Sequence, residues 1–74
     1  MENKPLNRLK IVLAEQDKTN KWLAEQLGKD PATISKWVTN TSQPDLKNLM
    51  KISQILHVDL SELLRFENLD TQEN

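Results

Sequence analysis

The chain has 74 residues, with ten Lys and Arg against eleven Asp and Glu, one His and no Cys, and its formal net charge is −1. This length fits one small domain, and a pocket for a drug-sized ligand would take up much of its core, which disfavours an enzyme. Without cysteine, and with one histidine, we expect no disulfide, metal centre or cofactor. Neither a membrane-spanning apolar run nor a signal peptide is visible, which predicts a cytoplasmic protein.

The near-zero net charge hides an uneven distribution. Residues 1–51 carry nine basic and six acidic side chains, which is +3, whereas residues 52–74 carry one basic and five acidic side chains, which is −4. The distribution is more informative than the average, because a basic region within a neutral chain is compatible with a polyanionic partner.

The first half of the chain predicts three helices. The first has an apolar stripe at helical spacing and Pro5 in its first turn. The second has Thr19 as its N-cap and ends at Gly28, which fits a left-handed position. The third begins at Asp30-Pro31: Asp30 can cap the helix, and the fixed φ of Pro31 suits the first helical position. The three apolar stripes are Leu6, Leu9, Val12 and Leu13; Leu23, Ala24 and Leu27; and Ile34, Trp37 and Val38.

Two further helices are expected after a loop at residues 39–44, which is made of turn-forming residues. The fourth helix starts at Asp45 and ends near His57, which tolerates a positive φ. Asp59 and Glu62 resemble a capping box for a fifth helix. These elements predict an all-α, five-helix domain over residues 1–65, followed by a polar, acidic and fraying tail over residues 66–74.

The segment from Asn20 to Val38 carries the most specific signal. Two short helices joined by a tight turn at Gly28 must cross steeply, and the small Ala24 lets them approach. This spacing is that of a helix-turn-helix, and the chain resembles the phage repressor and Cro-like (Xre-type) helix-turn-helix family from Leu6 to Leu64. The matching stretches are residues 22–28, WLAEQLG; residues 33–37, TISKW; residues 44–49, PDLKNL; and residues 56–64, LHVDLSELL.

The resemblance implies a compact five-helix bundle of the lambda-repressor-like type that binds double-stranded DNA. It places the recognition helix, Asp30–Val38, in the major groove, with its polar face opposite the apolar stripe. The expected base-reading residues are Pro31, Ala32, Thr33 and Lys36. The expected contacts to the DNA backbone are Asn20, Lys21, Ser35, Asn40 and Thr41.

The implied function is that of a small transcriptional repressor, bound as a homodimer to a palindromic operator and nucleoid-associated when bound. The second helix begins with Thr19-Asn20-Lys21-Trp22 rather than the usual Ser/Thr-Gln-Glu-Glu. The loop at residues 38–42 lacks the family's basic residues, so a phosphate contact there has no cation and rests on Asn40 and Thr41 alone. A protein-interaction module or an antitoxin, using the C-terminal end to hold a protein partner, therefore stays open.

Three smaller hypotheses concern single side chains. Trp37 is expected in the core, whereas Trp22 fits either packing or stacking on single-stranded nucleic acid. An apolar patch near the C-terminal end is either a dimer contact or part of the core; its members are Leu60, Leu63, Phe66 and Leu69. His57 with Ser53 and Asp59 does not form a catalytic set, because nothing supplies an oxyanion hole, and no catalytic residue is expected.

Overall fold

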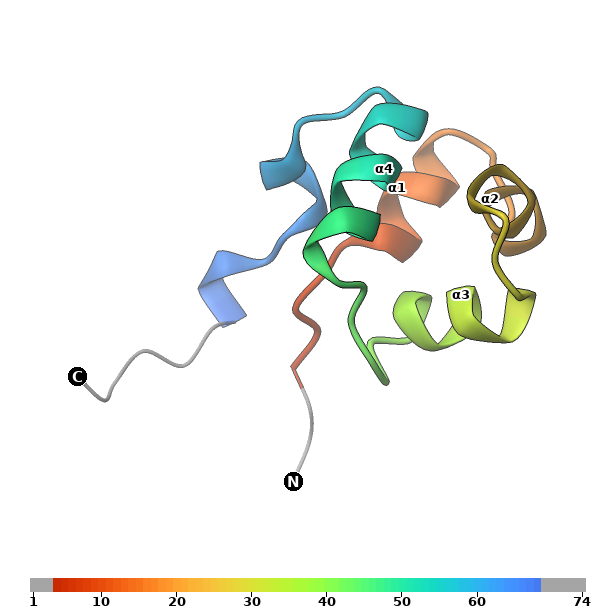
Figure 1. Ribbon diagram of the computed structural model, residues 1–74. Helices are drawn as coiled ribbons and strands as arrows, with labels where there is room; N and C mark the ends of the chain where they lie inside the picture. The colour runs from red at the N-terminus through yellow and green to blue at the C-terminus, as the bar shows by residue number, and fades with distance from the viewer. Residues whose placement is uncertain (1–3, 69–74) are drawn as a thin grey trace.

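The structure is a computed structural model that describes residues 4–68. Within this part of the chain, four α-helices are followed by two short 3-10 helices (Figure 1). The elements are α1 (Leu9–Glu15), α2 (Asn20–Leu27), α3 (Pro31–Val38), α4 (Leu46–Leu56), η1 (Leu60–Leu63) and η2 (Phe66–Asn68).

The helix boundaries follow from local caps, as the sequence predicts. The side chains of Thr19, Asp30 and Asp45 each accept a hydrogen bond, of 2.9–3.4 Å, from a backbone N–H two or three residues further on. Each bond satisfies a donor that the first turn of a helix leaves free. Gly28 ends α2 at φ 66°, and His57 ends α4 at φ 57°. Both left-handed positions are confirmed.

The fifth helix is a correction to the predicted fold. Residues 60–63 do carry the Asp59–Glu62 capping box, but they form the 3-10 helix η1 rather than an α-helix. The chain leaves the helix at Leu64, whose backbone is extended and pairs antiparallel with Asn7. The described residues therefore contain four α-helices. Backbone pairing with the N-terminal segment ends the predicted fifth helix after one turn.

The same pairing corrects the start of the first helix, which begins at Leu9 and not near Pro5. The backbone N–H of Arg8 donates to the carbonyl of Leu63 at 2.9 Å, and that of Arg65 to the carbonyl of Leu6 at 2.8 Å, so the segment before α1 pairs with the chain after η1 instead of continuing the helix. Leu6, predicted on the apolar stripe, is 39% exposed as a result.

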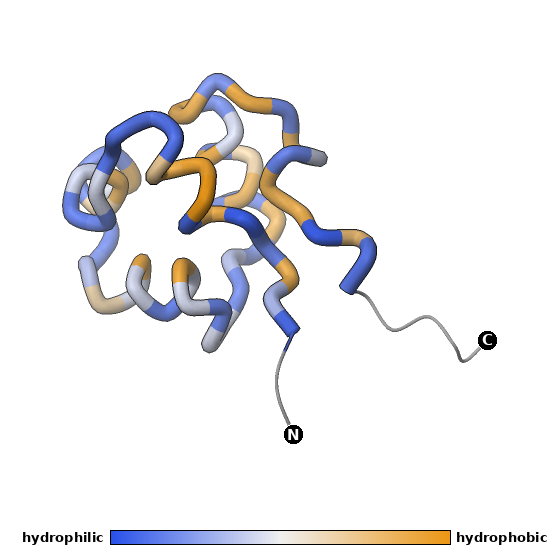
Figure 2. The backbone as a smooth tube through the Cα atoms, turned by 180° about the vertical axis from the view of Figure 1, so that it is seen from behind, coloured by the Kyte–Doolittle hydropathy of each residue, from blue (hydrophilic) through white to orange (hydrophobic). Residues whose placement is uncertain are grey.

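The core lies between the four helices and η1. The helix α2 packs against α3, α1 contacts α3 and η1, and α4 contacts α2 and η1. Hydrophobic and hydrophilic segments alternate along the backbone, as amphipathic helices require (Figure 2). The buried apolar side chains are Leu9, Val12, Leu13, Leu23, Ala24, Ile34, Trp37, Val38, Ile52, Leu56 and Leu63. Trp37 is thus confirmed as a core residue.

Candidate nucleic-acid interface

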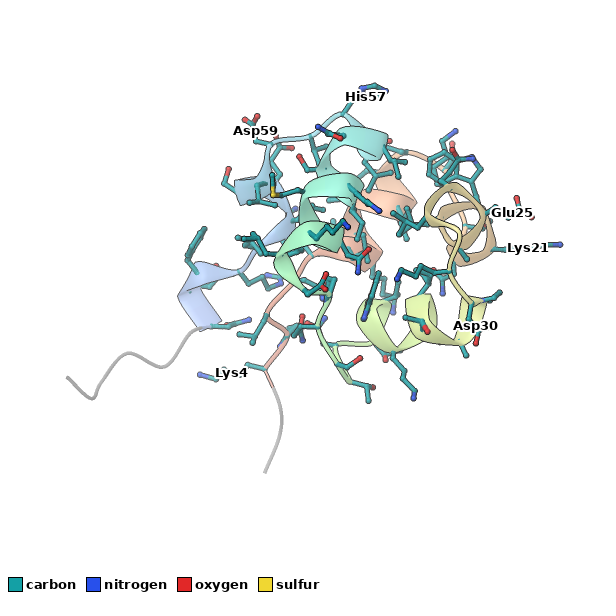
Figure 3. The ribbon with its side chains drawn as sticks, viewed as in Figure 1. Lys4, Lys21, Glu25, Asp30, His57 and Asp59 are labelled. Atoms are coloured by element: carbon teal, nitrogen blue, oxygen red, sulfur yellow. The ribbon has the colours of Figure 1, made fainter. Side chains whose placement is uncertain are left out.

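The outward face of α3 brings the four predicted base-reading residues onto one helix. Asp30 caps the helix, and Ile34 and Trp37 anchor its inner face in the core. Figure 3 shows Asp30 at the start of α3, at the edge of the molecule. Among the predicted contacts, Pro31, Ala32, Ser35 and Lys36 are exposed and Thr33 is half-buried. The exposed face therefore carries two small apolar residues, Pro31 and Ala32, one short polar residue, Ser35, and one long cation, Lys36.

The start of α2 presents the next two predicted residues. Lys21 is exposed and points outward in Figure 3, and Asn20 is half-buried. The cation of Lys18 lies 4.7 Å from the centre of the Trp22 ring. Trp22 also packs against the core. The Trp22 ring thus contacts both Lys18 and the core, which favours packing over base stacking.

The loop after α3 holds Asn40 in a network inside the protein. Its backbone is left-handed, with a φ of 62°. Its Oδ1 accepts from the backbone N–H groups of Leu6 and Asn7, at 2.8 and 3.0 Å, and from Gln43 Nε2 at 3.1 Å. Its Nδ2 donates to the Asn7 carbonyl at 3.2 Å. The amide therefore holds the N-terminal segment against the end of α3. Both its oxygen and its nitrogen are already hydrogen-bonded within the protein, which disfavours a phosphate contact.

Thr41, the other predicted loop contact, is exposed. Its hydroxyl lies 2.8 Å from that of Thr39, which in turn donates to the Ser35 carbonyl at 3.0 Å. This chain of hydroxyls extends the exposed polar surface from the end of α3 into the loop.

Comparison with known proteins agrees with this geometry. A helix-turn-helix family model of the Cro/C1 type matches residues 9–63, most of the chain. The chain belongs to the Cro/C1-type helix-turn-helix family. It is also similar to a solved protein from Bacteroides fragilis that is described as proposed to bind DNA. The identity is 53%, the TM-score is 0.79, and the match covers 81% of this chain and 97% of that one. No curated protein is significantly similar.

One residue that supports this Cro/C1-type site, Asn7, was not predicted from the sequence. Asn7 is 4% exposed, and its side chain bridges three elements. Its Nδ2 donates to the Trp37 carbonyl at 3.0 Å and to Gln43 Oε1 at 2.8 Å. Its Oδ1 accepts from the backbone N–H of Leu9 at 2.9 Å, at the start of α1. The one local signal was its residue type, because Asn is favoured just before a helix.

Asp45, the N-cap of α4, has a shifted pKa. The backbone N–H of Asn48 lowers the pKa of the Asp45 carboxyl, and the Asn48 side chain, Lys29 and Lys47 act in the same direction. Asp45 therefore stays ionised and keeps its cap at neutral pH.

The described part of the chain contains no helix long and apolar enough to cross a bilayer. Over the same residues, 4–68, no group of three or more His, Cys, Asp or Glu side chains is placed to hold a metal ion.

Proposed function

We propose that this protein binds double-stranded DNA sequence-specifically as a small transcriptional regulator, acting as a repressor, with α3 in the major groove. The observation that carries the proposal is the outward face of α3. Its side chains are exposed along a helix whose inner face is fixed by Ile34 and Trp37 in the core. A rigid helix that presents short side chains is suited to close approach to base edges.

Each base-reading residue has a chemical partner on DNA. Lys36 can donate to guanine O6 or N7, and Thr33 can bond to a base or a phosphate. Pro31 and Ala32 offer apolar surface to a thymine methyl group. Only Lys36 and Thr33 among these side chains can form hydrogen bonds with base edges. We therefore infer that DNA shape and deformability supply part of the specificity.

The backbone contacts in this proposal come from α2, α3 and the loop after α3. Asn20, Lys21, Ser35 and Thr41 are the direct contacts, which set affinity and register without reading sequence. Asn40 is retained in a different role: its internal hydrogen bonds hold the loop in the shape that presents Thr41.

A homodimer on a palindromic operator completes the proposal, with two copies of α3 about one helical turn of DNA apart. Exposed apolar side chains on α4 support self-association, since Leu46 is 65% and Met50 53% exposed. In the patch expected near the C-terminal end, Leu63 is buried and Leu60 is half-buried against the core. Phe66 is exposed, and Leu69 lies outside the described residues.

Selection of bound sequences from random duplex DNA, carried out at two salt concentrations, tests this function. We expect enrichment of a palindrome, which indicates both specificity and dimeric binding. Selection without enrichment, together with binding that disappears at modest salt, would contradict the proposal.

A second candidate function is protein binding, as an interaction module or antitoxin. A shallow apolar hollow of about 170 Å³, lined by Leu6, Leu64, Arg65 and Phe66, favours it, because exposed apolar surface marks interaction sites. Phe66 is 65% exposed there. Phe66→Ser separates the two functions: loss of a protein partner with DNA binding intact indicates that this hollow serves protein binding.

A further inference from the structure

A second hollow, of about 470 Å³, lies where the start of α1 meets the end of α3, and we call it the α1–α3 hollow. Three of its lining residues are cationic, and two more come from the end of α3 and its loop; they are Arg8, Lys10 and Arg65, and Thr39 and Asn40. Arg65 is more than fifty residues from Arg8 and Lys10 in the sequence, but the fold brings the three cations together beside the recognition helix.

The α1–α3 hollow carries a net positive charge. No carboxylate among residues 4–68 lines it. At its edge Glu67 pairs with Arg65 at 3.1 Å, so three cations less one carboxylate leave two positive charges. Arg8 Nη1 donates to the backbone carbonyl of Glu62 at 3.0 Å, which orients the guanidinium without neutralising it. Lys10 is exposed.

One nitrogen of the Arg65 guanidinium lacks an acceptor, although Nη1 pairs with Glu67. The Arg65 Nε is buried and has no hydrogen-bond partner within residues 4–68. An unpaired buried donor on a charged group is unfavourable, and a phosphate oxygen is the kind of acceptor that a guanidinium binds best. The buried Nε is itself out of a ligand's reach, so the cationic side chains that line the α1–α3 hollow are what favour an oxyanion over an apolar side chain as its ligand.

We propose that the α1–α3 hollow binds one backbone phosphate of the DNA that α3 contacts. This inference rests on the proposed function. With eight residues, α3 is about 12 Å long, which is close to the width of the major groove. We infer that a sugar-phosphate strand that borders the groove passes near the end of α3, which lines the hollow through Val38 and Thr39. Lys10 and Arg8 then supply the cations that the loop at residues 38–42 lacks.

Salt titration of DNA binding tests the phosphate contact. The protein is titrated into labelled duplex DNA between 50 and 200 mM salt, and the slope of log K against log salt is compared for the wild type, Lys10→Gln and Lys51→Gln. Lys51 is the matched control, because it is an exposed helix lysine that does not line the hollow. Each phosphate contact contributes about 0.9 to the slope, or about 3.5-fold in affinity over this fourfold range.

We expect Lys10→Gln to reduce the slope by about 0.9 on specific and non-specific duplexes alike, and Lys51→Gln to leave it unchanged. Arg8→Gln should show the same loss, with folding checked by circular dichroism. Wild-type binding with equal slopes for Lys10→Gln and Lys51→Gln would overturn the phosphate contact alone. Absence of wild-type binding to any duplex would overturn both this inference and the proposed function.

Discussion

Replacement of Asn40 tests whether one amide holds the N-terminal segment against the recognition helix. Asn40→Gly removes the acceptor for the N–H groups of Leu6 and Asn7 but keeps the left-handed backbone accessible. Each of these hydrogen bonds contributes about 0.5–1.5 kcal/mol, so we expect a loss of about 1–3 kcal/mol. Asn40→Ala adds the strain of a positive φ, about 1–2 kcal/mol more.

These losses are large relative to the stability of so small a domain, about 4–11 kcal/mol at ordinary values per residue. Urea unfolding followed by circular dichroism measures them, and Thr41→Ala, an exposed change in the same loop, should stay within about 0.5 kcal/mol of the wild type. The order of stability should be wild type, then Gly, then Ala. If Asn40→Gly unfolds at the same urea concentration as the wild type, the amide does not hold the segment, and the structural role of Asn40 is refuted.

Three further predictions concern DNA readout, a helix end and a helix start. Lys36→Ala should weaken the preferred duplex by about 1–3 kcal/mol and relax the preference at one base pair, as measured by fluorescence anisotropy; an unchanged profile removes Lys36 from base readout. Gly28→Ala should cost only about 1–2 kcal/mol of stability, because φ is 66° but no atom lies within 4 Å of an added Cβ; a larger loss on thermal melting would indicate a clash. Asp45 has a lowered pKa, so its stabilising effect is present above the unfolded-state pKa and is lost as pH falls through the folded value. Asp45→Asn, which keeps a capping side chain, should therefore reduce the acid sensitivity of the melting temperature below about pH 4, and an identical pH profile would contradict this.

The helix ends could be predicted because their causes are local. Thr19, Asp30 and Asp45 cap the backbone within three residues of themselves, and Gly28 and His57 take left-handed conformations that end their own helices. The outward direction of Lys36 follows from the same short-range periodicity, because Ile34 and Trp37 define the inner face.

The two corrected elements have a shared non-local cause. Leu64 and Asn7 pair across most of the chain, and this pairing both shortens the predicted fifth helix to η1 and delays the start of α1 to Leu9. Neither segment carries the alternating pattern of a strand, so nothing in the sequence near either residue indicates its partner. The capping box at Asp59 predicted correctly where a turn begins, but not how far it continues.

The sequence by itself determined the helix-turn-helix, its family and the face of α3 that is proposed to meet DNA, because caps, apolar spacing and the turn at Gly28 all act over a few residues. Only the tertiary structure decided that Asn40 is bound to the N-terminal segment, 33 and 34 residues away, rather than left free in the loop. The tertiary structure also brought Arg8, Lys10 and Arg65 to the end of α3. Contacts of this kind depend on how the helices pack, and one side chain's local sequence does not contain that information.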